Sequence, residues 1–315
     1  MKIGVIITVM ILTIGKNVVQ AQYKVVGYIP NYQDAVIDFS KVTHVNLAFE
    51  NADDQGNLSF SARNNAYIRE AHRQGVKVLI SLGGGYASED TLIQKRYFNL
   101  IRDENRDAFV HKISTYLDEH GVDGLDVDLE GSAINGDYGA FIKSLSAALR
   151  PNGKLLTAAL SHTNGAGKVP AEIFSYFDFI NIMAYDSTGP WRPGNPGQHS
   201  SFEFAKECLQ YWTDRGLPKS KTILGVPFYG YGFGEDFNHG MSYAQIIETY
   251  ADAEEKDVSG NTIYYNGVAT IKRKVHHVVD NGYGGIMIWQ LAQDATGSKS
   301  MLLVIDQVVN GNKSK

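Results

Sequence analysis

Three carboxylates recur at every second position of the short stretch Gly-Leu-Asp-Val-Asp-Leu-Glu, residues 124–130. Successive side chains of a β-strand point to opposite faces, so Asp126, Asp128 and Glu130 would share one face. At roughly 3.3 Å of rise per residue, their Cα atoms would lie about 6.6 Å apart. Like charges this close cannot all ionise freely, so the pKa of at least one carboxyl rises. The stretch predicts an acid that stays protonated near neutral pH and can donate a proton.

Two other interpretations of this stretch are a solvated edge strand and a site for a hard cation. The apolar residues between the acids and the flanking glycines favour a buried strand over a solvated one. Cation-binding loops carry their ligands on flexible polar backbone, whereas these acids alternate with leucine and valine. We therefore favour a strand of catalytic acids.

Composition narrows the class of protein. The chain has 315 residues, of which 43% are hydrophobic and 20% charged, which is ordinary for a globular protein with one core. A formal net charge of -5 argues against nucleic acid as the main partner. The one cysteine, Cys208, cannot form an intramolecular disulfide, and the histidines show no metal-ligand spacing beyond the adjacent His276 and His277.

The first residues predict an export signal. Lys2 is followed by an apolar run from Ile3 to Ile14, and Val-Gln-Ala ends at Ala21 as a cleavage site. The run of about 12 residues is shorter than the roughly 20 needed to span a bilayer. We expect a signal peptide over residues 1–21 and a secreted mature chain, residues 22–315, without a membrane span.

Apolar segments rich in β-formers alternate with helical ones along the mature chain. Strands are expected at 23–29, 43–49, 76–81, 124–130, 155–161, 179–185, 222–229 and 285–290. Helices are expected at 66–73, 91–120, 139–149, 173–176, 202–215, 243–250, 268–279 and 300–309. This alternation implies parallel strands joined by crossover helices, and eight units favour an α/β fold, a single-domain (β/α)8 TIM barrel. A doubly wound open sheet is the rival, but no glycine-rich phosphate loop opens the first helix.

In such a barrel the chemistry gathers at the carboxyl ends of the strands. Glu130 ends the fourth expected strand, and the other ends carry Tyr28, Phe49, Tyr185, Asp186, Tyr229 and Trp289. Aromatic faces stack on the C–H faces of pyranose rings, so acids ringed by aromatics predict a sugar site. For Phe49 and Phe228, filling of the core remains an equal alternative.

The spacing of the acids also bears on mechanism. Most retaining glycosidases place two carboxylates on opposite sides of the scissile bond, about 5 Å apart. Acids from one strand approach the sugar from one side, which favours the route in which the substrate's own acetamido group is the nucleophile. Our hypothesis is that Glu130 protonates the leaving oxygen and Asp128 orients the 2-acetamido group. Asp126 would hold Asp128 and share its proton.

The segment Asp-Gly-Leu-Asp-Val-Asp-Leu-Glu, residues 123–130, resembles the DGxDxDxE signature of family 18 glycoside hydrolases, the chitinases. Five further segments resemble the family and occur in its order along the chain: Ser81 to Gly84, Met183 to Asp186, Gly189 to Trp191, Leu224 to Gly230 and Gly284 to Trp289. The resemblance runs from about Tyr23 to the end of the chain.

The resemblance implies a role for each matching residue. Glu130 would be the proton donor and later the base, and Asp128 would stabilise an oxazolinium intermediate with support from Asp126 and Ser81. Tyr185 would hydrogen-bond the acetamido carbonyl. Substrate contacts are implied for Tyr28, Phe49, Gly84, Asp186, Trp191, Tyr229 and Trp289, with Trp289 under the distorted sugar and Trp191 on the leaving-group side. The family implies chitin or N-acetylglucosamine oligosaccharides as partner, no metal or organic cofactor, and we expect a monomer.

Two departures from the family pattern stand out. Tyr231 occupies the position where many members have arginine. The connection after the seventh strand is also shorter than the large α+β subdomain that many members insert there. We therefore expect one helix in that connection and a shallow, open cleft suited to cutting within chains.

Three alternative functions remain open. An endo-β-N-acetylglucosaminidase acting on N-glycans or a peptidoglycan hydrolase would share the fold and the acid strand. The Tyr185–Asp186 pair and Trp191 favour chitin. A non-catalytic chitin-binding lectin is the alternative from another class, and the presence of Glu130 with its supporting acids favours an enzyme.

Overall fold

The structure, a computed structural model, describes residues 23–235, 238–260 and 262–311. Its centre is a closed barrel of eight parallel strands in the order β1-β12-β7-β6-β5-β4-β3-β2. These strands are β1 (Lys24–Pro30), β2 (His44–Ala48), β3 (Lys77–Gly83), β4 (Gly124–Asp128), β5 (Leu155–Leu160), β6 (Phe179–Ile182), β7 (Thr222–Pro227) and β12 (Gly285–Trp289). The predicted TIM barrel is confirmed, and the predicted signal peptide lies outside the described residues.

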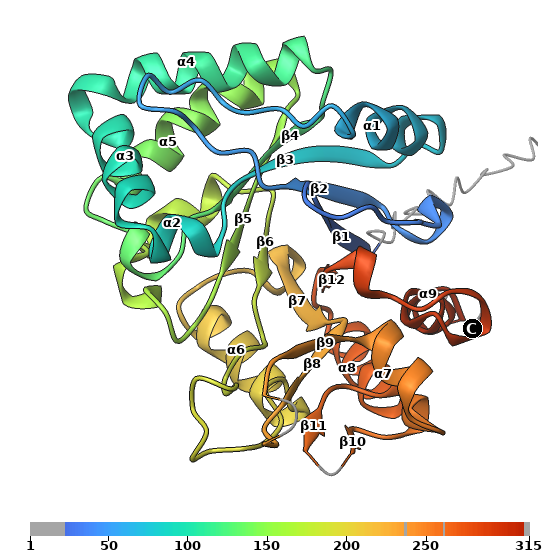
Figure 1. The fold of residues 1–315 in the computed structure, drawn as a ribbon. Helices are drawn as coiled ribbons and strands as arrows, with labels where there is room; N and C mark the ends of the chain where they lie inside the picture. The colour runs from blue at the N-terminus through green and yellow to red at the C-terminus, as the bar shows by residue number, and fades with distance from the viewer. Residues whose placement is uncertain (1–22, 236–237, 261, 312–315) are drawn as a thin grey trace, which may run out of the picture.

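Helices cover the outside of the barrel, as Figure 1 shows. They are α1 (Asn64–Arg73), α2 (Gly85–Glu89), α3 (Thr91–Ile101), α4 (Asp103–Glu119), α5 (Tyr138–Leu149), α6 (Phe202–Asp214), α8 (Val268–Asp280) and α9 (Met301–Gly311). The expected helix over 91–120 is two helices, because the extended backbone of Arg102 interrupts it. The expected piece at 173–176 is a 3-10 helix, Ala171–Ser175. No helix in the described ranges is long and apolar enough to cross a membrane.

Two apolar clusters explain how β4 presents its acids. One cluster packs between strands and helices and includes Leu125 and Val127. The other, smaller cluster contains inward residues of the strands, among them Tyr28 and Met287. Because side chains alternate along a strand, Asp126 takes the inward direction while its neighbours join the outer cluster. Every residue of β4 is buried, which excludes the solvated edge strand.

The connection between β7 and α8 contains more structure than the expected helix. That helix is α7 (Tyr243–Thr249), and four short strands accompany it: β8 (Tyr229–Gly232), β9 (Gly240–Ser242), β10 (Val258–Ser259) and β11 (Ile263–Tyr264). The strands form a small antiparallel sheet in the order β10-β11-β8-β9, beside α7 in Figure 1. Strands of two to four residues are too short to show the alternation by which strands are predicted.

Candidate active site

Asp126 is the innermost of the three acids, and hydrogen bonds hold it in place. Its carboxylate is fully buried and accepts four hydrogen bonds. The Tyr28 hydroxyl (2.7 Å) and Ser81 Oγ (2.8 Å) donate to Oδ2, while Thr157 Oγ1 (2.6 Å) and Asn181 Nδ2 (3.4 Å) donate to Oδ1. Burial raises the pKa of Asp126, and the four donors oppose that rise. The arrangement therefore holds a carboxylate in one orientation.

Sequence reasoning missed two of these donors, Thr157 on β5 and Asn181 on β6. Neither belongs to the acid motif, yet each is a polar residue on an apolar strand. The register pairs Asp126 with Thr157, and Thr157 with Phe179, two residues before Asn181. A polar residue at an inward position of a neighbouring strand was the signal that could have identified both.

Asp128 lies two residues farther along β4, nearer the mouth of the barrel, and has a different environment. Its side chain is 4% exposed, and its Oδ1 is a buried atom without a hydrogen-bond partner among the described residues. Burial, followed by the charges of Glu130 and Asp126, raises the pKa of Asp128 well above its usual range. An unpaired buried polar atom costs roughly 1–3 kcal/mol, so this carboxyl favours a ligand that supplies a polar partner.

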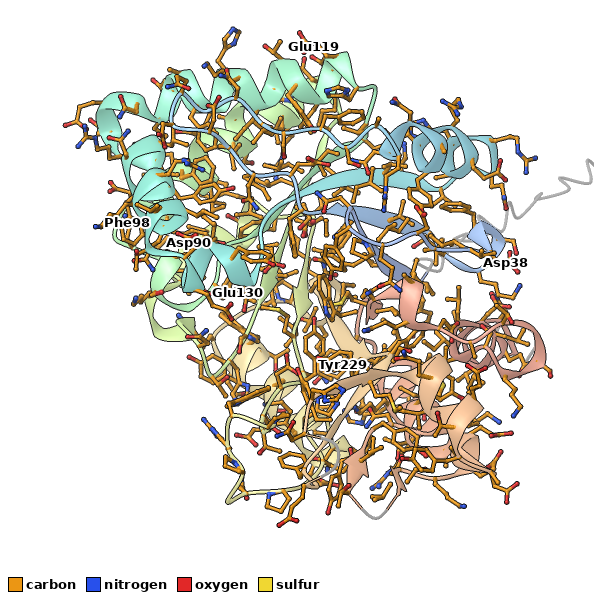
Figure 2. The ribbon with its side chains drawn as sticks, viewed as in Figure 1. Asp38, Asp90, Phe98, Glu119, Glu130 and Tyr229 are labelled. Carbon is orange, nitrogen blue, oxygen red and sulfur yellow. The ribbon has the colours of Figure 1, made fainter. Side chains whose placement is uncertain are left out.

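Glu130 lies two residues beyond the end of β4, has an extended backbone and precedes a 3-10 turn, Gly131–Ala133. Burial, then the negative charges of Asp186 and Glu89, raises the pKa of Glu130 to about 7. Figure 2 labels Glu130 and Tyr229 in the central region of the molecule, whereas Glu119 lies at its periphery. A carboxylic acid with this pKa exchanges a proton readily near neutral pH.

Aromatic rings lie near the carboxyl ends of β1, β2 and β12. Trp289 contacts Tyr28 edge-to-face at a centroid distance of 5.4 Å and stacks on Phe49 at 5.5 Å. Gly84 lies against the same group, since a Cβ there would be 2.5 Å from the Phe49 ring, and its φ of 73° favours glycine. Phe49 thus belongs to the candidate site, whereas Phe228 is buried in the outer core.

The end of β6 contributes Tyr185 and Asp186. Burial and the charges of Asp128, Asp186 and Glu130 raise the pKa of Tyr185, so its hydroxyl lies within the field of the acids. The Tyr229 hydroxyl donates to Asp186 Oδ1 at 2.6 Å. Asp186 has a left-handed backbone (φ 61°), which is rare for a residue other than glycine and is typical of functional sites.

His199 is a third residue that sequence reasoning missed. It is completely buried, and its Nδ1 accepts the backbone N–H of Asp186 at 3.3 Å. Its Nε2 lies 3.3 Å from the Tyr229 carbonyl oxygen, and its ring contacts those of Tyr229 and Tyr231. Because it lies in an irregular segment 13 residues beyond Asp186, no spacing in the sequence indicated this contact.

Exposed aromatic side chains stand on segments that follow strand ends. Trp191, on the connection between β6 and α6, is 55% exposed, while Tyr32 and Tyr86 are 64% and 66% exposed. Sequence reasoning missed Tyr32 and Tyr86. They follow β1 and β3 by two and three residues, a position that could have indicated them. Burial, and after it the electrostatic influence of Tyr86, raises the pKa of Tyr32.

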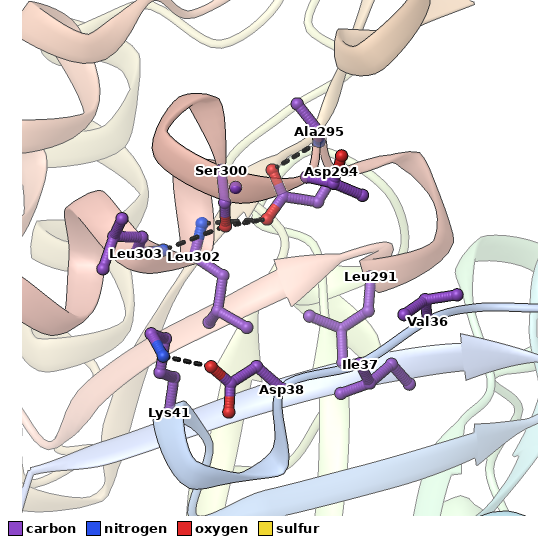
Figure 3. A pocket seen from close by; sticks show the side chains of 12 residues that line it. Val36, Ile37, Asp38, Lys41, Leu291, Asp294, Ala295, Ser300, Leu302 and Leu303 are labelled. Carbon is purple, nitrogen blue, oxygen red and sulfur yellow. Dashed lines mark hydrogen bonds and ion pairs between the residues drawn. The ribbon is translucent and has the colours of Figure 1, made fainter.

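A separate cavity of about 250 Å³ lies between the segments that follow β1 and β12, and Figure 3 shows it from close by. Its lining includes Val36, Asp38, Lys41, Leu291, Asp294 and Leu302, and none of the β4 acids. Its charged groups are already paired: Lys41 with Asp38, and Asp294 with Ser300 and the start of α9. Within the described ranges, no group of three or more His, Cys, Asp or Glu side chains could hold a metal ion.

A (β/α)8 barrel with three acids along and just beyond β4 and with aromatic rings about its mouth has the side-chain chemistry of a carbohydrate-binding barrel. The sequence profile described as Glycosyl hydrolases family 18 matches residues 24–294. The chain belongs to this family. The resemblance inferred from the sequence motifs is therefore confirmed.

Similar proteins support the family and its fold. A crystal structure of a family 18 chitinase from the chitin utilization locus of Flavobacterium johnsoniae is 40% identical, with a TM-score of 0.86 over 93% of this chain and 96% of that one. Probable chitinase 10 of Drosophila melanogaster is 28% identical over 72% of this chain, which spans only 12% of that protein's length. A chitinase-like agglutinin of Robinia pseudoacacia, 21% identical with a TM-score of 0.77 over 90% and 99% of the chains, shares the fold alone.

Proposed function

We propose that the protein is a secreted chitinase that hydrolyses β-1,4 bonds between N-acetylglucosamine units by a substrate-assisted, retaining mechanism. The acid strand is the observation that carries this proposal. Asp126 is held by four donors, Asp128 is buried with a raised pKa, and Glu130 has a pKa of about 7. The three together suit an acid that acts beside an oriented acetamido group.

In the first step Glu130 donates its proton to the glycosidic oxygen, and the C1–O bond breaks. The acetamido carbonyl oxygen of the same sugar attacks C1 and forms the oxazolinium ion, while Asp128 accepts the acetamido N–H. Tyr185, whose hydroxyl lies in the field of the acids, donates to the acetamido oxygen. In the second step Glu130 takes a proton from water, whose oxygen attacks C1 and restores the acetamido group with net retention.

The remaining residues bind the polymer. Trp289 with Phe49 and Tyr28 floors the position of the distorted sugar, and Asp186 with Tyr229 binds its hydroxyl groups. Trp191 stacks on the leaving-group side, where its indole is exposed. Over its described residues, the insertion after β7 is a small sheet with one helix, which supports an open cleft and cutting within chains. Export after Ala21 and action as a monomer belong to the same proposal.

Product analysis tests the substrate class. The mature chain is incubated separately with a chitin hexasaccharide and with a high-mannose glycoprotein, and the products are measured by mass spectrometry. Short chitin oligomers with an unchanged glycoprotein are expected, and internal cutting gives trimers and dimers before monomer. Released glycan with an intact hexasaccharide would instead establish an endo-β-N-acetylglucosaminidase.

The Glu130→Gln variant separates an enzyme from a lectin. It keeps the size of the side chain and removes the transferable proton, so cleavage should fall by at least about a hundredfold while chitin binding persists. Glu119→Gln is the matched control, because this glutamate is exposed on α4, away from the acids (Figure 2). Equal binding with no cleavage by wild type and variant would show a lectin.

A further inference from the structure

The exposed indole of Trp191 is fixed between two neighbours. A Cβ on Gly189 would lie 2.2 Å from two carbons of the six-membered indole ring, so the ring lies directly on the Gly189 backbone. The ring of Tyr231 contacts the indole edge-to-face, at a centroid distance of 5.1 Å and an interplanar angle of 85°. An exposed tryptophan is thus held in one orientation while much of its surface stays open to solvent.

Tyr231 is itself rigidly placed. It lies in β8, where it pairs with Gly240 of β9 and Tyr264 of β11. Its ring contacts His199 at 4.9 Å and Tyr229 at 5.4 Å. Burial, then the charge of Asp186 and a side-chain hydrogen bond to it, raises the pKa of Tyr231. Backbone, ring and hydroxyl are therefore all engaged, and the ring edge that faces Trp191 cannot move freely.

We propose that Tyr231 is a positioning residue that determines specificity for long chains, because its ring holds Trp191 ready for stacking. This inference rests on the proposed function, in which Trp191 binds sugar on the leaving-group side. A free indole loses rotamer freedom when a sugar stacks on it, whereas an indole that is already fixed does not. The preorganisation corresponds to roughly a twofold to tenfold gain in affinity.

The same feature accounts for the departure at Tyr231 from the arginine of many family members. A guanidinium would offer hydrogen bonds to a sugar directly. The phenol ring of Tyr231 supports sugar binding indirectly, through Trp191 beside it. The sugar contact that the sequence put in doubt at Tyr231 is therefore replaced by support for the stacking surface of Trp191.

Kinetics on chitin oligosaccharides of increasing length test this role. Tyr231→Leu should raise KM for the hexasaccharide by roughly twofold to tenfold with kcat little changed. Tyr231→Phe keeps the ring and should stay within about twofold of wild type. In a Trp191→Ala background, Tyr231→Leu should differ little from Tyr231→Phe, because the indole that the ring holds is gone and both variants lack the hydroxyl that binds Asp186. Tyr264→Leu is the matched control, since it removes a tyrosine ring from the same small sheet with no ring contact to Trp191.

Time-resolved fluorescence anisotropy gives a readout without substrate. The signal of Trp191, obtained by difference from Trp191→Ala, should show faster local motion in Tyr231→Leu and wild-type motion in Tyr231→Phe and Tyr264→Leu. Unchanged motion in Tyr231→Leu, or equal losses of affinity in Tyr231→Leu and Tyr264→Leu, would overturn the inference. If Trp191→Ala leaves KM unchanged for every oligomer, the proposed stacking function of Trp191 fails, while the anisotropy still decides whether Tyr231 holds the indole.

Discussion

The pKa of Glu130 offers a quantitative test of the site. Its rise from 4.5 to about 7 corresponds to about 3 kcal/mol between the neutral and charged forms. Burial is the largest cause, Asp186 is the second and Glu89 the third. Because Glu130 must be protonated to act as the acid, kcat/KM should be at its maximum below this pKa and should fall as the pH rises through about 7.

Asp186→Asn removes the second cause and keeps the size of the side chain. Asparagine tolerates a left-handed backbone, and its side-chain oxygen can still accept from Tyr229. Without the neighbouring negative charge the pKa of Glu130 falls, so the alkaline limb of the pH profile moves to lower pH. Burial exceeds either charge, so the displacement should be a few tenths to about one pH unit.

The assay is kcat/KM against pH, with a chitin oligosaccharide that carries a chromophoric leaving group. The midpoint pH of the alkaline limb is compared rather than the maximal kcat/KM, because Asp186 is also proposed to bind substrate. Glu89→Gln should move the limb in the same direction by less, since this carboxylate is exposed and screened by salt. Glu119→Gln should move nothing. A limb that stays in place or moves to higher pH in Asp186→Asn would refute the electrostatic argument.

Three further substitutions probe the surroundings of the acids. Asp128→Asn should abolish cleavage yet stabilise the fold at neutral pH, because a carboxyl whose pKa is raised by folding destabilises the fold as the pH rises from its usual pKa towards the raised one. Urea unfolding at several pH values measures this. Thr157→Val should lower the free energy of unfolding by about 1–3 kcal/mol by removing a donor to buried Asp126, with Thr157→Ser near wild type in the same unfolding experiment. Gly84→Ala should lower both Tm and kcat/KM, since the added Cβ would meet the Phe49 ring and the backbone there has a positive φ. Calorimetry and initial rates measure the two effects, and wild-type values of both would contradict the prediction.

The sequence was most informative where one physical requirement acts on a whole segment. The barrel strands are apolar on the helix side and form at nearly the predicted positions, because burial on both faces enforces long runs of β-formers. The β4 acids stood out because alternation puts them on one face of such a strand. The strands β8 to β11 were missed for the opposite reason, since each is too short to carry a period.

The contacts across the site depend on the closed barrel and could not be read along the chain. His199 reaches Asp186 only because the β6–α6 segment folds back over the strand end. Tyr231 meets Trp191 only because β8 leaves the barrel beside that segment. Tyr32 and Tyr86 follow strand ends, so their place near the mouth was predictable from position alone, whereas the electrostatic influence of Tyr86 on Tyr32 was not.

The acid strand assigns different tasks to residues of the same chemistry by the number of donors available to each. Asp126, the innermost, accepts four hydrogen bonds, which favour its charged form despite full burial. Asp128 has an unpaired oxygen and two acidic neighbours, so its neutral form is favoured until a ligand arrives. Glu130 lies beyond the last ladder residue, where partial access to solvent leaves its pKa about 7. Burial and the number of donors therefore give the three acids different proton affinities, highest at the middle one, and the group at the mouth is the one able both to give and to retake a proton near neutral pH.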